Sequence, residues 1–225
     1  MNLPSGYIVS LLGQSGCGKT TILRAIAGFE PVRSGEIRVN GHVISSTNIQ
    51  VPPEKRYIGM TFQDYALFPH LTAEENIGFG LRKLNHSDKT KRIDEMFGLI
   101  GLDKLRKNYP HEMSGGQQQR ITLARALAPE PNLLLLDEPF SNLDTDLREK
   151  IAFEVRDILK KTGHTAILVT HNQFEAFSIA DRIGIIFDGK IIQWDTPYNI
   201  RNYPANSFVK NFIRPERIFC TNPFI

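Results

Sequence analysis

The 225-residue sequence contains little cysteine and no long apolar run, and both absences narrow the classes of protein to which it can belong. Two cysteines, Cys17 and Cys220, are too few for a disulfide framework and indicate a reducing cytosol. No apolar run approaches the length that crosses a bilayer, and no signal peptide precedes the first apolar segment. We therefore expect a soluble, cytosolic protein that reaches a membrane only through a partner.

The sequence also lacks a large excess of charge, since 27 basic residues face 24 acidic ones and no basic block concentrates them. This balance argues against nucleic acid as a partner. Internal repeats and low-complexity tracts are absent as well. Instead, short apolar runs alternate with amphipathic stretches, which predicts an α/β fold with a mostly parallel sheet in one domain of residues 1–225.

The predicted strands are short and bounded by turn residues, and they cover residues 8–12, 35–41, 57–62, 132–136, 165–170, 183–187 and 190–194. The predicted helices cover residues 19–28, 73–84, 88–100, 115–128, 147–163, 173–180 and 197–213, with Ser87 as the N-cap of the third. Residues 35–41 end in Asn-Gly, which favours a hairpin turn. We interpret residues from about 72 to 128 as a helical subdomain that is inserted in the chain and stands off the main sheet.

The first strand leads directly into a glycine-rich loop and a helix, which is the arrangement of a phosphate-binding loop. Backbone N–H groups of such a loop form an anion-binding concavity, and the helix N-terminus adds positive dipole character. Lys19 supplies a charge for the β- and γ-phosphates of ATP, and Thr20 a hydroxyl for Mg²⁺. The alternative is a glycine-rich turn without a ligand. The expected ATP-binding residues are Gly13, Gln14, Ser15, Gly16, Cys17, Gly18, Lys19, Thr20 and Thr21.

A second element is the run of four leucines at 133–136, which predicts a buried strand that ends in Asp137 and Glu138. An isolated buried charge is costly, and open α/β sheets hold their ligands at the carboxyl ends of strands. Asp137 suits a residue that holds Mg²⁺ through water. Glu138 points the other way along an extended chain and suits a general base for attack on the γ-phosphate. Alternatively, the two acidic residues cap the next helix, from Leu143 onward.

A third element places two glycines directly before a helix, in Ser114, Gly115, Gly116 and Gln117. Bare backbone N–H groups at a helix N-terminus form a second anion-binding device. Two such devices with one set of metal and base residues make sense if this helix start closes over the nucleotide of a second subunit. An ordinary glycine-containing helix entry is the alternative. His171, which follows a predicted buried strand, is either catalytic or a structural residue or cap.

Taken in order, these motifs resemble the ATP-binding cassette of ABC transporters, over nearly the whole chain from Ile8 to about Ile213. The resemblance implies that Gln63 contacts Mg²⁺ and the attacking water, and that His171 is the switch histidine that reaches the γ-phosphate. It also implies a head-to-tail homodimer, or a pair with a second such ATPase. Two ATP molecules then lie between residues 13–20 of one subunit and 114–117 of the other. The loop at this interface is Ser141, Asn142, Leu143 and Asp144.

Further stretches, at 52–56, 65–72 and 193–197, resemble the importer ATPases for ferric iron, polyamines, sulfate and sugars, and 204–209 is most similar to the ferric-iron and polyamine members. The resemblance implies ATP hydrolysis coupled to uptake. The partners are integral membrane permease subunits and, indirectly, a substrate-binding protein. The location is peripheral, at the cytoplasmic face of the inner or plasma membrane. A soluble ABC-type ATPase, a small-molecule kinase and an ATP-binding module with little hydrolysis are the alternatives.

The sequence departs from the family pattern in three places. Met113 replaces a leucine before Ser114, which is a tolerated change of similar volume. Only twelve residues precede Gly13, so we expect the N-terminal antiparallel strands and the adenine-stacking aromatic residue to be missing, and ATP binding by the chain to be weak. Residues 213–218 resemble a segment of a C-terminal regulatory domain, of which the rest is missing.

Overall fold

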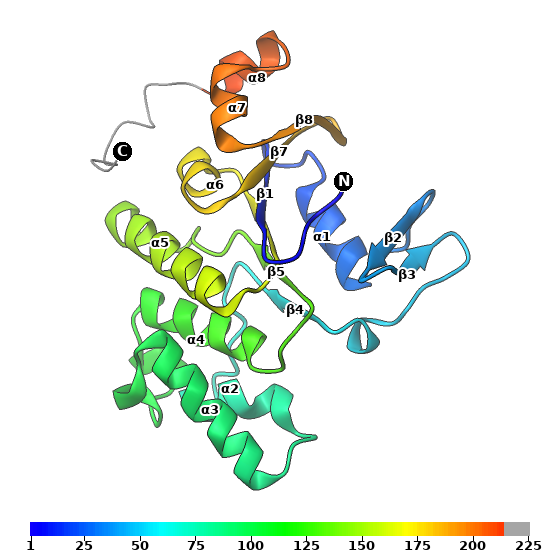
Figure 1. The fold of residues 1–225 in the computed structure, drawn as a ribbon. Coiled ribbons are helices and arrows are strands. Elements are labelled where there is room, and N and C mark those ends of the chain that lie inside the picture. The colour runs from blue at the N-terminus through cyan, green and yellow to red at the C-terminus, as the bar shows by residue number, and fades with distance from the viewer. Residues whose placement is uncertain (214–225) are drawn as a thin grey trace.

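Six strands form one sheet in the computed structural model, which describes residues 1–213 (Figure 1). Their order is β4-β5-β6-β1-β7-β8. The strands are β1 (Ile8–Leu12), β4 (Ile58–Thr61), β5 (Leu133–Asp137), β6 (Ala166–Thr170), β7 (Arg182–Phe187) and β8 (Lys190–Asp195). All neighbours pair in parallel except β7 and β8, which form an antiparallel hairpin. The predicted mostly parallel α/β sheet is confirmed. Cys220 and most of the segment 213–218 lie outside the described residues.

The middle strands are mostly apolar because helices cover both faces of the sheet. All residues of β1 and β6 are buried, as are the four leucines of β5. A separate two-stranded sheet consists of β2 (Glu36–Val39) and β3 (His42–Ser46), and it projects beside α1 in Figure 1. Asn40 and Gly41 join its strands with φ of 50° and 79°, the left-handed conformation that a tight hairpin turn requires. The hairpin predicted from Asn-Gly is thus confirmed.

The helices largely follow the predicted order. They are α1 (Lys19–Ala27), α2 (Ala73–Gly78), α3 (His86–Ile100), α4 (Gly115–Leu127), α5 (Thr145–Thr162), α6 (Gln173–Ile179), α7 (Pro197–Asn202) and α8 (Ser207–Phe212). The predicted cap of α3 is wrong. Asn85, not Ser87, is the N-cap, because its side chain accepts a hydrogen bond from the Asp88 N–H and the helix begins earlier.

Two predicted helices are interrupted. The segment 73–84 is α-helical only to Gly78 and continues as a 3₁₀ turn, Phe79–Leu81, since two glycines within three residues weaken the helix. The tail 197–213 is divided into α7 and α8, because Pro204 lies between them and Asn206 caps α8.

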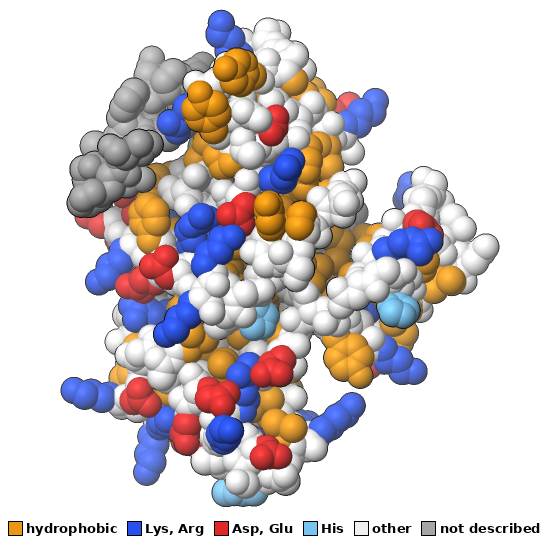
Figure 2. Space-filling view, viewed as in Figure 1, with side chains coloured by type: hydrophobic (Ala, Val, Ile, Leu, Met, Phe, Trp, Pro, Cys, Tyr) orange, Lys and Arg blue, Asp and Glu red, His pale blue; other side chains and the backbone are white. Residues whose placement is uncertain are grey.

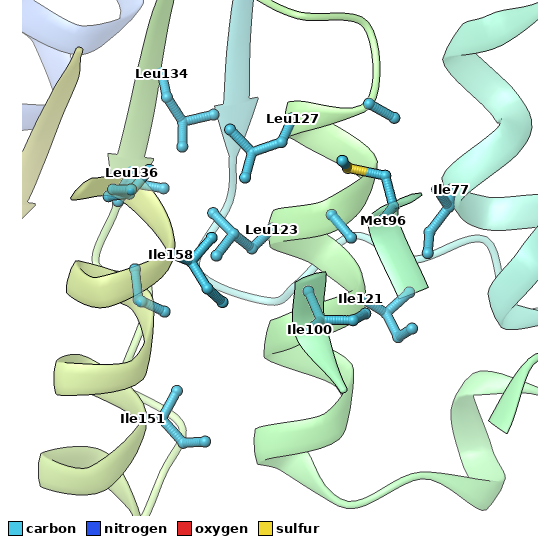
Figure 3. Packing of buried hydrophobic residues seen from close by; sticks show 14 of the residues in the cluster. Ile77, Met96, Ile100, Ile121, Leu123, Leu127, Leu134, Leu136, Ile151 and Ile158 are labelled. Carbon is cyan, nitrogen blue, oxygen red and sulfur yellow. The ribbon is translucent and has the colours of Figure 1, made fainter. Parts of the chain in front are cut away.

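One apolar core joins the helical subdomain to the sheet (Figure 3). Leu123 and Leu127 of α4 face Leu134 of β5, and the same cluster continues to α2 and α3. Other members shown there are Ile77, Met96, Ile100, Ile121, Leu136, Ile151 and Ile158. The helices α2 and α3 lie away from the sheet, whereas α4 contacts both β4 and α5. The expectation that the whole segment stands off the sheet is therefore corrected, because burying this apolar face requires close packing.

The face of the molecule seen in Figure 2 carries basic and acidic side chains interspersed over the helical subdomain, and apolar side chains gather mainly above it. Among residues 1–213, no helix is both long enough and apolar enough to span a bilayer.

Candidate functional site

Three adjacent strands end at the same edge of the sheet, and each delivers a predicted site residue there. Leu12 at the end of β1 pairs with Thr170 at the end of β6, and Asp137 at the end of β5 pairs with Val169. The loops that begin at Gly13, Glu138 and His171 therefore start at the same level. Parallel strands thus bring together segments that lie far apart in the sequence, at the edge where such sheets bind ligands.

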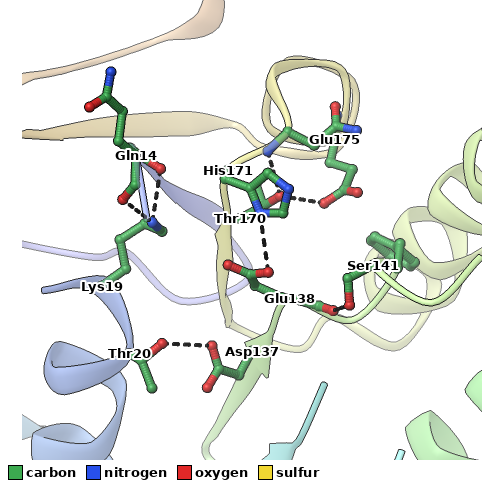
Figure 4. A network of polar contacts seen from close by, with 12 residues as sticks. Gln14, Lys19, Thr20, Asp137, Glu138, Ser141, Thr170, His171 and Glu175 are labelled. Atoms are coloured by element: carbon green, nitrogen blue, oxygen red, sulfur yellow. Dashed lines mark hydrogen bonds and ion pairs between the residues drawn. The ribbon is translucent and has the colours of Figure 1, made fainter. Parts of the chain in front are cut away.

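The loop that the sequence predicts to bind phosphate lies between β1 and α1. Gly18 precedes α1 with φ of 98°, a conformation that side chains other than glycine rarely adopt. A Cβ at Gly13 would lie 2.5 Å from the Ile186 carbonyl oxygen, so only glycine fits there. The Lys19 side chain is 4% exposed, and its Nζ donates to the Gly13 and Gln14 carbonyl oxygens at 2.8 and 2.7 Å (Figure 4). The ammonium group is thus held inside the curve of its own loop.

Thr20 and Asp137 meet across this edge. The Thr20 hydroxyl donates to Asp137 Oδ1 at 3.2 Å (Figure 4). Burial, and secondarily the nearby Glu138 carboxylate, raise the pKa of Asp137, while the Thr20 hydrogen bond opposes the rise. One hydroxyl and one carboxylate oxygen suit Mg²⁺, which usually keeps several waters and takes few protein ligands. Residues 1–213 contain no cluster of three His, Cys, Asp or Glu side chains that could hold a metal on its own.

Glu138 and His171 form the second pair. Glu138 Oε2 lies 3.1 Å from His171 Nδ1, and Figure 4 shows Glu138 on the side away from Thr20. The opposite directions of Asp137 and Glu138 agree with the prediction, but its reason was wrong. Glu138 lies beyond the end of β5 with φ of 44°, so a left-handed turn and not an extended chain directs its side chain.

The loop Ser141–Asp144 follows Glu138 and contacts both the start of α5 and Gln63. Asp144 is the N-cap of α5, with its side chain accepting from the Leu147 N–H at 2.9 Å, so this residue, and not Asp137 or Glu138, caps the next helix. Asn142 Nδ2 donates to the Gln63 carbonyl oxygen at 2.7 Å. The backbone of Gln63 is thereby tied to this loop, while its side chain is exposed to solvent.

Ser114 begins α4 with a reciprocal capping box, in which Ser114 Oγ accepts from the Gln117 N–H and Gln117 Oε1 from the Ser114 N–H. Gly115 lies against Leu143 and Tyr65, since a Cβ there would be 3.0 and 3.4 Å from their side chains. Within residues 1–213, no side-chain hydrogen bond joins Ser114 or Gln117 to the phosphate-binding loop. The role of 114–117 toward a second subunit therefore stays a prediction.

Sequence reasoning missed three charged residues that support these loops. Arg125 of α4 donates to the carbonyl oxygens of Tyr65 and Ala66 at 3.1 and 2.7 Å, where both residues have positive φ. Tyr65 is 8% exposed and belongs to the packed interior. Arg148 of α5 and Glu175 of α6 lie behind the Glu138 and His171 loops. Charges in amphipathic helices look like ordinary surface charges in a sequence, so no signal could have found them.

Comparison with known proteins adds to this geometry. The family model described as ABC transporter matches residues 1–141. The chain is 46% identical to the putrescine transport ATP-binding protein PotG of Escherichia coli, over 97% of this chain and 58% of PotG. It is 49% identical to the Fe(3+) ions import ATP-binding protein FbpC 2 of Haemophilus influenzae, over 98% of this chain and 63% of that protein.

A solved structure resembles the fold as well. The ATP-binding cassette MJ0796, in a dimeric post-hydrolysis state bound to ADP and Pi, superposes with a TM-score of 0.73 at 30% identity, covering 88% of both chains. The chain spans about three-fifths of the length of the curated relatives named above.

Proposed function

Since the chain belongs to the ABC transporter family, we propose that it binds and hydrolyses ATP as the ATPase subunit of an importer. The observation that supports this most is the meeting of two polar pairs, Thr20 with Asp137 and Glu138 with His171, beside the loop that holds Lys19. In this proposal the loop binds the phosphates through backbone N–H groups, and Lys19 supplies the charge.

Glu138 is the general base in this proposal. Its carboxylate accepts the proton of the attacking water, and His171 Nδ1, at 3.1 Å, holds the carboxylate in place from the exposed side. The Asp137 carboxylate lies on the other side of the strand end, near Thr20, so in this proposal Asp137 binds the metal while Glu138 accepts the proton. Thr20, Asp137 through water and Gln63 would hold Mg²⁺, which would supply positive charge against the phosphate oxygens.

The partner surface includes the start of α4. Ser114 is exposed and lies at a helix N-terminus, where anions are stabilised, yet among the described residues its hydroxyl bonds only within its own capping box. We propose that Ser114–Gln117 of one subunit close over the nucleotide held by residues 13–20 of another, with Ser141–Asp144 between them. The dimeric state of MJ0796 with ADP and Pi agrees with such an arrangement.

The names of the relatives support a proposal for the transport partners. PotG is named for putrescine and FbpC 2 for ferric iron, so we propose uptake of a polyamine or of ferric iron through membrane permease subunits and a substrate-binding protein. The chain would then lie peripherally at the cytoplasmic face of the membrane. Purification together with an integral membrane protein would separate this proposal from that of a soluble ABC-type ATPase.

The deciding experiment compares Glu138→Gln with Lys19→Ala. Glu138→Gln keeps the size of the side chain and removes the base, so turnover of ATP should fall about 10²–10⁴-fold while ATP still binds. Lys19→Ala should abolish ATP binding itself. Lys190→Ala, at the exposed start of β8, is the matched control and should change neither property. Normal hydrolysis by Glu138→Gln would refute the base assignment. An unaltered chain that binds ATP without hydrolysing it would favour a binding module.

A further inference from the structure

The buried carboxylate of Glu175 lies next to the candidate site and takes no part in the proposed hydrolysis of ATP. Glu175 lies in the first turn of α6 and is 2% exposed. Its Oε2 accepts a hydrogen bond from Thr170 Oγ1 at 2.5 Å, and Thr170 directly precedes His171 (Figure 4). The same hydroxyl accepts from the Asn172 N–H at 2.9 Å. The residues on both sides of His171 thus share the Thr170 hydroxyl, which Glu175 holds.

Arg148, in the first turns of α5, connects this carboxylate to the loop that follows Glu138. Its Nε donates to the Phe140 carbonyl oxygen at 3.1 Å and its Nη2 to the Leu143 carbonyl oxygen at 2.7 Å. Nε also lies 3.9 Å from Glu175 Oε1. One planar guanidinium group therefore contacts the loop at two carbonyl oxygens and the buried carboxylate at the same time, a geometry that lysine cannot reproduce.

We propose that Arg148 and Glu175 are a positioning pair that fixes the loop of Glu138 against the loop of His171. The proposal rests on the proposed ATPase function, because it concerns the geometry of that same site. Neither residue touches the reacting atoms. Their effect is to keep Glu138 Oε2 within hydrogen-bond distance of His171 Nδ1, since each member of the pair holds one of the two loops.

Glu175 is almost fully buried, so its carboxylate depends on the groups around it. Burial raises the pKa of Glu175, and the Thr170 hydrogen bond and the charge of Arg148 oppose the rise. Removing one member of such a pair leaves the charge of the other member without an opposite charge, so the loops must rearrange. The phosphate-binding loop makes no hydrogen bond with either residue in the part of the chain described, so nucleotide affinity should not depend on the pair.

The test uses three variants that keep the size of the side chain as far as possible: Glu175→Gln, Arg148→Lys and Thr170→Val. Each should lower kcat for ATP about 10- to 100-fold, the loss that accompanies a misplacement of about 1 Å, with KM for ATP within about twofold. In a His171→Ala background, the same changes should lower kcat no further. Glu154→Gln is the matched control and should leave kcat unchanged. Glu154 Oε2 lies 3.1 Å from Arg120 Nη2, and this ion pair involves neither of the two loops.

A second measurement does not depend on turnover. The ¹⁵N resonances of the His171 ring, assigned with a His171→Gln variant, should shift in Thr170→Val and Arg148→Lys in the direction that Glu138→Gln produces, and stay in place in Glu154→Gln. Absence of ATPase activity in the unaltered chain would contradict the proposed function, while these resonances would still decide on the pair. Unchanged resonances, an unchanged kcat or a full additional loss in the His171→Ala background would overturn the positioning role.

Discussion

Replacing Asn76 by alanine is expected to lower the free energy of unfolding by about 3 kcal/mol. Asn76 lies in α2 and is fully buried. Its Oδ1 accepts from the Phe68 N–H at 2.9 Å, and its Nδ2 lies 3.0–3.2 Å from the carbonyl oxygens of Phe68, Leu71 and Thr72. The Nδ2 group has two hydrogens for these three acceptors, so the side chain makes about three full hydrogen bonds. Each contributes about 1 kcal/mol net.

Urea or thermal unfolding of the two proteins measures this difference. For a chain of this size, about 3 kcal/mol corresponds to a fall in Tm of roughly 6–12 °C. Asn202→Ala is the matched control, because Asn202 is exposed and, among residues 1–213, its Nδ2 donates only to the Tyr198 carbonyl oxygen, so we expect a change within about 0.5 kcal/mol. A loss below about 1 kcal/mol for Asn76→Ala would refute the reasoning, since the backbone groups of 68–72 would then have found other partners.

Asp137→Asn should stabilise the chain in the absence of Mg²⁺ and ATP. Because the pKa of Asp137 is raised in the folded chain, the free energy of unfolding falls as pH rises from the ordinary Asp pKa through the pKa of the folded chain. Unfolding measured at pH 4 and pH 7.5 should therefore show that the variant is more stable only at pH 7.5. Asp195→Asn should do the opposite and lose stability at pH 7.5, since hydrogen bonds from Asn199 and from the backbone lower the pKa of Asp195, and equal signs for the two variants would contradict this account. Gly13→Ala should abolish ATP binding measured by calorimetry, because its Cβ would lie 2.5 Å from the Ile186 carbonyl oxygen. Leu123→Ala should cost about 2–5 kcal/mol in urea unfolding, and a cost below 1 kcal/mol would show that the shared core collapses around the cavity.

The sequence predicted the fold well where burial determines local structure. Runs such as 133–136 are apolar on both sides because helices cover both faces of the sheet, so they indicate parallel strands directly. The meeting of Gly13, Glu138 and His171 followed from the same reasoning, since residues after parallel strands collect at one edge. Glycine conformation was predictable too, because the turn at Gly18 excludes other side chains.

The contacts between loops were not predictable in the same way. The capping of α3 by Asn85 and not Ser87 depends on a single hydrogen bond, and both residue types cap helices about equally well. Glu138 has a positive φ although it is not a glycine, so the sequence did not indicate a left-handed turn there. Arg148 and Glu175 become partners only when α5 and α6 pack together, so periodicity marks them as charges on helices and nothing more.

The position of Lys19 has a consequence for the thermodynamics of anion binding. Its ammonium group already donates to two carbonyl oxygens of the loop, so an incoming phosphate exchanges hydrogen bonds and does not simply add them. The net gain is the difference between two well-satisfied arrangements, and it is smaller than the bare attraction between a lysine and an anion. Simple anions such as sulfate should therefore compete poorly, and affinity has to come from the several contacts that a longer polyphosphate makes at once.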